Sequence, residues 1–299
     1  MVSDPVWFAS GTLLALGLTP LAARLARGIG WVDPRPGDLA AVARKRQRTA
    51  VPVAGGAVLL ILLCAIPAAF AGHASAFVAI GLAGLVGLLD DGLRGGLAPV
   101  PKVALQSAAA LPHALFWGAQ HGPAALLGFW LLALVAQNSA NTFDHQHGFC
   151  GTLGVCGLTG AFPWLAGCIA GFLPHNLRTD REGSSRIYLG DAGSHLIGMS
   201  IAVHPAAWPV LALPLVDLGR LAIVRIWVGS APWRGDRRHL GHRLEDAGLD
   251  ARERALVVLG ALLPTAFVSV PTALVLAAVF LAILLMICRR REIETVRTS

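Results

Sequence analysis

Long apolar runs follow one another along almost the whole chain, and this feature most constrains what the chain can fold into. Hydrophobic residues make up 55% of it and charged residues only 14%, whereas soluble domains average about 25% charged residues. A transmembrane helix needs about 20 predominantly apolar residues. Apolar runs lie at about 6–24, 51–72, 76–90, 103–119, 123–140, 150–173, 194–208, 210–228, 254–270 and 272–288. We therefore predict an all-α, polytopic membrane protein with about 10 transmembrane helices.

The basic residues predict how the helices are oriented. All 24 Lys and Arg fall in or near hydrophilic loops at 24–48, 94–102, 178–186, 220–254 and 289–297. The short turns near His73, His121, Pro205 and Pro271 carry none. Because cytoplasmic loops are enriched in Lys and Arg, the basic loops are expected in the cytoplasm. These stretches contain almost no aromatic residues, so we expect no nucleic-acid partner.

We expect one integral membrane domain over residues 1–299. Its first apolar run carries Asp4 and ends in Arg24 and Arg27, which favours a first span over a cleaved signal peptide. The expected cytoplasmic segments are loops at about 25–50, 90–102, 138–150, 175–193 and 229–253 and a tail at 289–299.

The segment 150–173 does not fit a simple count of spans. It lies between two polar loops that both belong on the cytoplasmic side, but two full crossings need about 40 residues. One alternative is a shortened or re-entrant helical pair turned at Pro163, and the other is a flip of topology. The short pair is preferred, because a flip would place every later basic loop outside.

Carboxylates are scarce, and most of them lie near the ends of apolar runs. Asp90 and Asp91 close the run GLAGLVGLLDD, Asp144 follows Asn138 and Asn141, and Asp191 lies in a Gly-Asp-Ala-Gly-Ser segment. A single aspartate at a helix end is more often a cap than a functional group. Several that gather on one face of a membrane protein indicate a functional site.

The neighbouring residues indicate which ligands such a site would take. Carboxylates gathered with Lys45, Lys102 and histidines suit Mg²⁺ and phosphate, because oxygen ligands bind the metal and cations bind the phosphoryl oxygens. His239 and His242 could share a helix face as zinc ligands or phosphate contacts. Zinc is the weaker alternative, because no cysteine lies nearby in the sequence.

Taken in order, the motifs resemble the polyprenyl-phosphate N-acetylhexosamine-1-phosphate transferase family. This is a glycosyltransferase family 4 type, and the nearest branch is the undecaprenyl-phosphate N-acetylglucosamine-1-phosphate transferases. Its members are polytopic enzymes that move a sugar-1-phosphate from a UDP-sugar to polyprenyl phosphate. The resemblance runs from about Thr19 to Leu244 through Asp33, Arg44-Lys45, Gly55-Gly56, Asp90-Asp91, Lys102, Gln106, Asn138, Asn141, Asp144, Tyr188 to Ser194, Pro214 to Asp217, Arg225 and Ala231 to His242.

The resemblance implies a Mg²⁺-dependent glycosyl-1-phosphate transferase, with Mn²⁺ as an alternative ion. Asp90 would deprotonate or orient the lipid phosphate, Asp91 would lie beside it near the metal, and Asp191 would bind the metal. These three are the expected catalytic residues, and Asp191 and Asp91 the expected metal ligands. The expected substrate-binding residues are Lys45, Asn138, Asn141, Asp144, His147, Tyr188, His239 and His242, with Tyr188 stacking on uracil.

The chain departs from the family pattern in its polar loops. The family sequence D-G-x-D-G is here Asp144-His145-Gln146-His147-Gly148, so histidines replace a glycine and an aspartate. The family sequence H-x-H-H has Gly241 at one histidine position. Because imidazole and carboxylate differ in charge and hydrogen bonding, turnover of the usual donor could be weak, altered or absent.

The resemblance also implies the surroundings of the protein. The expected partners are a UDP-sugar, polyprenyl phosphate and the bilayer, in the bacterial inner (plasma) membrane, during synthesis of cell-wall or lipopolysaccharide precursors. The oligomeric state is left open, with a homodimer among the alternatives. Two other functions were weighed: a catalytically impaired relative that binds polyprenyl phosphate or partner proteins, and a multispan transporter. A transporter is disfavoured, because transporters place their charges near the bilayer midplane.

Overall fold

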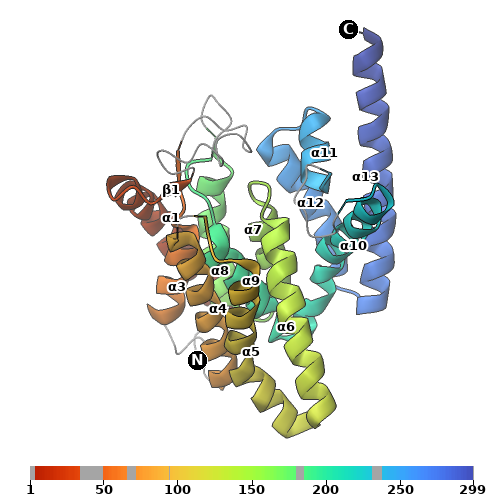
Figure 1. Ribbon diagram of the computed structural model, residues 1–299. Helices are drawn as coiled ribbons and strands as arrows, with labels where there is room; N and C mark the ends of the chain where they lie inside the picture. Colours follow the sequence, from red (N-terminus) through yellow and green to blue (C-terminus); the bar gives the residue numbers. More distant parts are fainter. Residues whose placement is uncertain are drawn as a thin grey trace.

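The computed structural model describes residues 4–33, 50–65, 72–93, 95–179, 185–230 and 238–298, and these form an almost entirely helical bundle (Figure 1). The helices are α1 (Asp4–Gly28), α3 (Gly55–Ala65), α4 (Ala74–Gly92), α5 (Pro99–His121), α6 (Pro123–Phe143), α7 (Phe149–Leu158), α8 (Pro163–Asn176), α9 (Gly190–Ala202), α10 (Ala212–Trp227), α11 (Leu240–Asp246), α12 (Ala251–Thr265) and α13 (Val270–Thr298). A 3₁₀ helix, η2 (Pro205–Leu211), leads into α10.

Within the described residues, five stretches of helix are long and apolar enough to cross a membrane: α1, α4, α6, η2 with α10, and most of α13. They also carry large hydrophobic side chains on the outside of the bundle, such as Leu13, Leu85 and Val275, which are 69%, 51% and 63% exposed. Because water would disfavour such a surface, it is suited to lipid. The protein is therefore an all-α membrane protein, as predicted. The number of crossings and their direction stay predictions.

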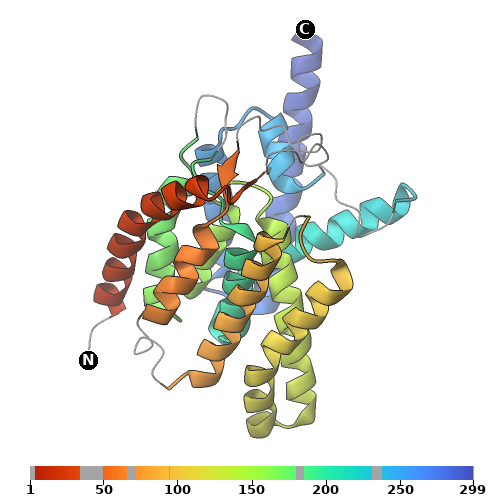
Figure 2. The same ribbon diagram turned by 60° about the vertical axis from the view of Figure 1, so that its left-hand side comes forward.

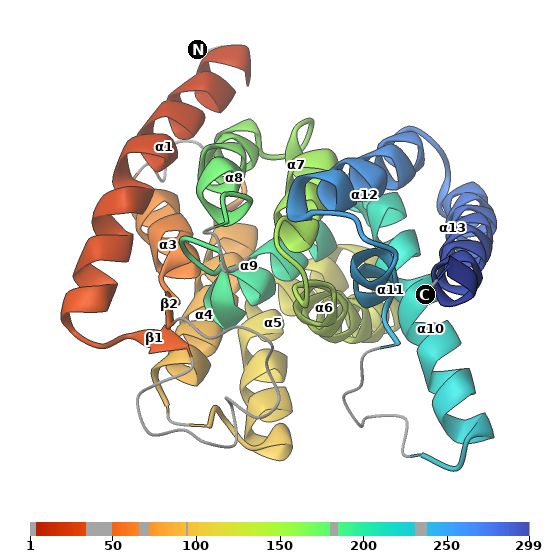
Figure 3. The same ribbon diagram turned by 90° about the horizontal axis from the view of Figure 1, so that it is seen from above.

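Helix α9 lies at the centre of the bundle. Seen from above, α3, α4, α6 and α7 surround it (Figure 3), and α9 packs against all four. Every residue from Ala192 to Ala202 is buried. The position of the α9 N-terminus is thus set by its neighbours, and the ends of α4 and α6 lie around it.

The segment 150–173 forms the short helical pair that the sequence favoured. Helices α7 and α8 are joined by four residues and pack against each other, and Pro163 is the first residue of α8. A proline fits there because the N–H group that proline lacks would have no hydrogen-bond partner within the first turn of a helix. Glycines on α8 then let it contact α1 closely: a Cβ on Gly167 would lie 2.1 Å from the Phe8 carbonyl oxygen.

Two very short strands hold the polar end of the bundle together, which the sequence did not predict. Strand β1 (Val32–Asp33) pairs antiparallel with β2 (Val51–Pro52). The chain before α9 continues this contact, because the Tyr188 N–H donates to the Pro52 carbonyl at 2.8 Å. The N–H groups of Gly55 and Gly56 donate in turn to the carbonyls of Tyr188 and Leu189. Tyr188 is thereby fixed two residues before α9 begins.

Helix α10 differs from the other helices in direction. It extends sideways from the bundle in the turned view (Figure 2), while the end of α13 rises above it. The outward part of α10 is apolar and exposed, with Trp227 at 90% and Ile223 at 70%. The opposite face of the same helix buries Asp217 and Arg225.

The start of α9 is held against α4 by a contact that only glycine permits. A Cβ on Gly87 would lie 2.2 Å from the Asp191 carbonyl oxygen, which is closer than Cβ atoms approach backbone atoms. We expect Gly87→Ala to force α4 away from α9 and to destabilise the protein by about 1–3 kcal/mol, the usual cost of overpacking. The measurement is the midpoint of thermal unfolding of the purified protein in detergent.

Gly81→Ala is the matched control, because Gly81 lies on the same helix and its added Cβ would meet only Leu63, at 4.0 Å. We expect this variant to unfold at or slightly above the wild-type midpoint, since alanine is the better helix former. Equal midpoints for the two variants would contradict the close contact of α4 with α9.

Candidate active site

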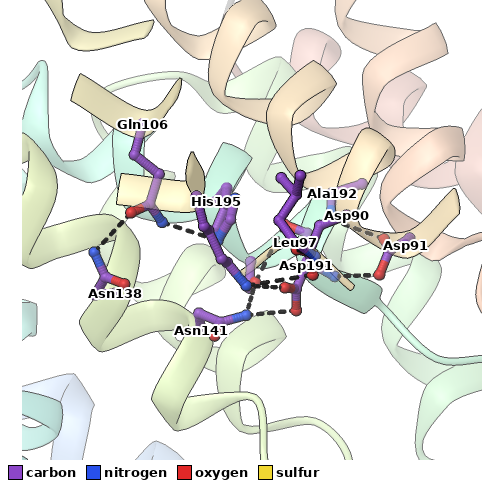
Figure 4. Close-up of polar contacts among 11 residues, drawn as sticks. Asp90, Asp91, Leu97, Gln106, Asn138, Asn141, Asp191, Ala192 and His195 are labelled. Carbon is purple, nitrogen blue, oxygen red and sulfur yellow. Dashed lines mark hydrogen bonds and ion pairs between the residues drawn. The ribbon is translucent and has the colours of Figure 1, made fainter. Parts of the chain in front are cut away.

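The end of α4 and the start of α9 meet through a carboxylate that caps a helix. The two oxygens of Asp91 accept the backbone N–H groups of Asp191 and Ala192, each at 2.9 Å (Figure 4). The first N–H groups of a helix have no partner within it, and they attract negative charge. Asp91 therefore holds the α9 N-terminus at the end of α4.

Gly190 is needed for this capping contact. Its φ is +76°, a backbone conformation that side chains disfavour, and a Cβ there would lie 2.5 Å from a carboxylate oxygen of Asp91. The glycine before Asp191 thus serves the turn and leaves room for the capping carboxylate.

A cation lies between two other carboxylates. The Lys102 ammonium, in the first turns of α5, contacts the Asp191 carboxylate and lies 3.4 Å from Asp90 Oδ2. The other Asp90 oxygen accepts the Leu97 N–H at 2.7 Å. All three side chains are largely buried, so the charges interact in poor contact with water.

Asn141 completes the contacts of Asp191. Its Nδ2 donates to Asp191 Oδ1 at 2.6 Å and lies 3.0 Å from Ser194 Oγ (Figure 4). Asn141 comes from the last turn of α6. The ends of α4, α5 and α6 thus all place polar groups at the first turn of α9.

Asp144 is a further carboxyl group just after α6. Burial raises the pKa of Asp144 well above the usual range of an aspartate, and the charges of Asp191 and Asp91 raise it further. Asp144 therefore interacts electrostatically with the carboxylates at the start of α9.

A chain of buried amides lies beside the carboxylates. Asn138 Nδ2 donates to Gln106 Oε1 at 3.0 Å, and Gln106 Nε2 lies 3.1 Å from His195 Nε2 (Figure 4). Gln106 and His195 are fully buried. Asn138 Nδ2 thus joins α6 to α5, and the expected role of Asn138 in substrate binding stays a prediction.

Two aromatic rings lie together next to the same site. The imidazole of His147 stacks on the Tyr188 ring, with centroids 5.6 Å apart and planes inclined by 20°. A flat heterocycle such as uracil binds well on such a surface. The two residues expected at the nucleotide are thus neighbours, although 41 positions separate them in the sequence.

His239 and His242 belong to a third group, around α11. His239 Nδ1 lies 3.4 Å from the buried carboxylate of Asp217, and His242 Nδ1 lies 3.0 Å from Gln146 Nε2. His145 lies against both imidazoles. No third ligand completes a zinc site, since no three His, Cys, Asp or Glu side chains of the described residues are placed to hold a metal ion.

The structure thus places the predicted site residues in three neighbouring groups. Asp90, Asp91, Asn141, Asp144 and Asp191 form the carboxylate group, His147 and Tyr188 the ring pair, and His239 and His242 the histidine group. Lys45 lies outside the described residues.

Several residues of the site were not predicted as site residues. Lys102 was expected as a cation of the site but was given no individual role, and Gln106 and His195 were not expected to bind substrate, although each follows a signal in the sequence. Gln106 lies four residues after Lys102 and His195 four residues after Asp191, so each pair shares a helix face. His145 and Gln146 were missed because no sequence pattern connects them to α11.

The raised pKa of Asp144 predicts a pH dependence of stability. A folded-state pKa above the unfolded value means that the proton stabilises the fold, and that this stability is lost as the pH rises through the folded pKa. We expect the unfolding midpoint of Asp144→Asn, minus that of the wild type, to increase as the pH rises from 4 to 8 in EDTA. This range starts at about the ordinary pKa of an aspartate and extends above it. Midpoints of both proteins across this range check it.

Asp250→Asn provides a control of opposite sign. Asp250 caps α12, and its hydrogen bonds from the backbone of Glu253 and Arg252 hold its pKa below the usual value. Its charge stabilises the fold above the ordinary pKa, so this variant should lose stability relative to the wild type as the pH rises. A constant difference for Asp144→Asn over the whole range would contradict the crowding of carboxylates.

Comparison with known proteins relates the segment that carries these residues to a known family. The family model described as glycosyl transferase family 4 matches residues 73–208, which include Asp90, Asp91, Asn141 and Asp191. The chain is 27% identical over 287 residues to the undecaprenyl-phosphate alpha-N-acetylglucosaminyl 1-phosphate transferase of Escherichia coli strain K12, covering 79% of this chain and 75% of that protein.

Proteins of the same name in two other organisms are also similar. The Salmonella typhi protein is 26% identical over 80% of this chain and 75% of its own length. The Haemophilus influenzae protein is 32% identical over 32% of each chain. The matched segment contains these carboxylates, and over it this chain is similar to proteins of glycosyl transferase family 4.

Proposed function

We propose that this protein transfers N-acetylhexosamine-1-phosphate from a UDP-sugar to polyprenyl phosphate and releases UMP. The observation that carries the proposal is the group of Asp90, Lys102 and Asp191 at the start of α9, where membrane helices end. Undecaprenyl phosphate is named as the acceptor in its relatives. Such a site can meet a lipid phosphate from the bilayer and a soluble nucleotide from the water.

The reaction exchanges one bond to phosphorus for another. An oxygen of the polyprenyl phosphate forms a bond to the β-phosphorus of the UDP-sugar. The bond from this phosphorus to the bridging oxygen breaks, and that oxygen leaves with UMP. Since three phosphates meet, the main task of the protein is to position them and neutralise their charge.

Asp90 and Lys102 would act at the acceptor. The ammonium of Lys102 lies between Asp90 and Asp191, and it can neutralise an incoming phosphate while it stays near one of them. Asp90 is held by the Leu97 N–H and lies beside this cation, so it can orient the lipid phosphate or take its proton.

The carboxylate group would hold a magnesium ion together with the donor, because no three of the described side chains are placed to hold an ion by themselves. Carboxylate oxygens are the ligands that Mg²⁺ takes, usually one or two of them with substrate phosphates, and the Lys102 ammonium marks a place for positive charge between two of them. Asp191 would be a ligand, with Asp91 beside it at the start of α9. When bound, the ion would neutralise the diphosphate oxygens of the donor. Mn²⁺ is the alternative ion.

The nucleotide would lie on the side of the ring pair. His147 and Tyr188 offer a stacking surface for uracil, and His239 and His242 offer hydrogen bonds for phosphate or sugar. His147 replaces an acidic residue of the family pattern, so stacking would take a larger share of base recognition in this chain.

Orientation and location are part of the proposal. The C-terminal end of α1, whose sequence includes Arg24 and Arg27, and the start of α5, which includes Lys102, lie toward the same side of the bundle as the C-terminal end of α13 (Figure 1). By the positive-inside rule this side faces the cytoplasm, where UDP-sugars are made. We place the protein in the bacterial inner membrane as a multi-pass enzyme of envelope polysaccharide synthesis.

The decisive test is UMP release by the purified protein with undecaprenyl phosphate, Mg²⁺ and a panel of UDP-N-acetylhexosamines. Asp191→Asn should lower the rate about a hundredfold or more, because it removes a charge that acts on the reacting phosphates. EDTA should abolish release and added Mg²⁺ restore it, with Mn²⁺ as a second ion to compare. Asp250→Asn, which changes an exposed cap on α12, should leave the rate unchanged.

The result also separates the two functions that the sequence left open. A folded protein that releases no UMP with any donor, but binds undecaprenyl phosphate, would be an impaired relative. Release that is metal-dependent and lost in Asp191→Asn would establish the transferase and identify its sugar.

A further inference from the structure

The loop between α6 and α7 places His145 against the histidines of α11. The ring centroid of His145 lies 4.6 Å from that of His239 and 5.3 Å from that of His242. Its third neighbour is the ring of Phe149, at 5.6 Å. His145 thus lies between the start of α7 and the two histidines expected to bind the donor.

Gly241 leaves the space into which this loop packs. A Cβ at this position would lie 2.2 Å from Gln146 Cγ, 2.7 Å from His145 Nε2 and 3.0 Å from Phe149 Cε2. Any side chain on residue 241 would therefore require His145 and Gln146 to move. Gly241 does not have a positive φ, so the backbone conformation does not require glycine here. The lack of a side chain matters because it leaves room for the neighbouring loop.

The imidazole of His145 is fixed in one orientation. Its Nδ1 lies 2.8 Å from the Thr142 carbonyl oxygen, which can only accept, so Nδ1 carries the hydrogen. Burial, together with the nearby His239, lowers the pKa of His145 to about 3. The ring is therefore neutral, and its buried Nε2 has no hydrogen-bond partner among the described residues.

We propose that His145 is a positioning residue, which takes the volume left free by Gly241 and holds His239 and His242 in place for the sugar-nucleotide donor. The inference rests on the proposed function, since it assumes that the two histidines bind this donor. A buried Nε2 without a partner does not reach substrate by itself, so His145 acts through its neighbours.

The two departures from the family pattern then form one exchange. Position 145 carries an imidazole where the family pattern has glycine, and position 241 carries glycine where the pattern has an imidazole. The structure brings these two positions into contact. A third imidazole therefore lies beside those of His239 and His242, but it comes from the loop between α6 and α7 and not from α11.

The test is a double-mutant cycle of His145→Ala and Gly241→His. Each single variant should weaken equilibrium binding of UDP-N-acetylglucosamine about tenfold, a coupling usual for residues in contact. Each should raise the KM for this donor with kcat changed far less. The double variant should bind within about threefold of the wild type, because one imidazole again fills the shared space.

Gly241→Ala is a second variant for the case in which Gly241→His does not fold, because it adds only a Cβ atom. It should lower the unfolding midpoint, and His145→Ala in the same chain should recover part of the loss. Gly260→Ala is the matched control, because its added Cβ would meet nothing within 4 Å.

The proposal would be overturned if the effects of the substitutions at positions 145 and 241 were additive in both donor binding and unfolding midpoint. It would also be overturned if the single variants lowered kcat and left the KM for the donor unchanged. A failure of the proposed function has a different signature. If the wild type releases no UMP, donor binding and the unfolding midpoints still show whether positions 145 and 241 are coupled.

Discussion

The capping of α9 by Asp91 is the contact on which the rest of the site depends. Asp91 comes from the last turn of α4 and accepts two backbone N–H groups at the first turn of α9. The other charged groups of the site are placed relative to this contact: Asp90 precedes Asp91, Asp191 supplies one of the capped N–H groups, and Lys102 contacts both Asp90 and Asp191. Since bare N–H groups are costly in a membrane protein, capping also satisfies α9 where four helices surround it.

The loop from Asp144 to His147 connects the three parts of the site. Asp144 belongs electrostatically to the carboxylates, His145 and Gln146 contact the histidines of α11, and His147 stacks on Tyr188. Because the four residues are consecutive, a shift of any one group is transmitted to the other two. This explains why a change of residue type in the loop, such as the histidine at 145, requires a change at the position facing it.

The membrane fold and the main carboxylates could be predicted from sequence because the signals are local. Apolar runs and the aspartates that end them, such as Asp90 and Asp91, are read directly from the chain. What could not be predicted depends on contacts between distant segments. The β1–β2 pairing joins 33 to 51, Asn138 uses its amide within the bundle, and Gly241 matters only because residues 145 and 146 lie against it. No periodicity in the sequence encodes which loops meet.

The balance of charge explains how one buried site can serve two substrates of opposite solubility. Lys102 lies beside Asp90 and Asp191, and Asp91 and Asp144 belong to the same group, so the described residues of the site favour an added cation and resist an isolated phosphate. A metal ion would reverse this preference and make the same residues attractive to a diphosphate and then to a lipid phosphate. The carboxylates at the start of α9 would therefore make phosphate binding conditional on the ion, which favours entry of the metal with the nucleotide before the lipid phosphate attacks.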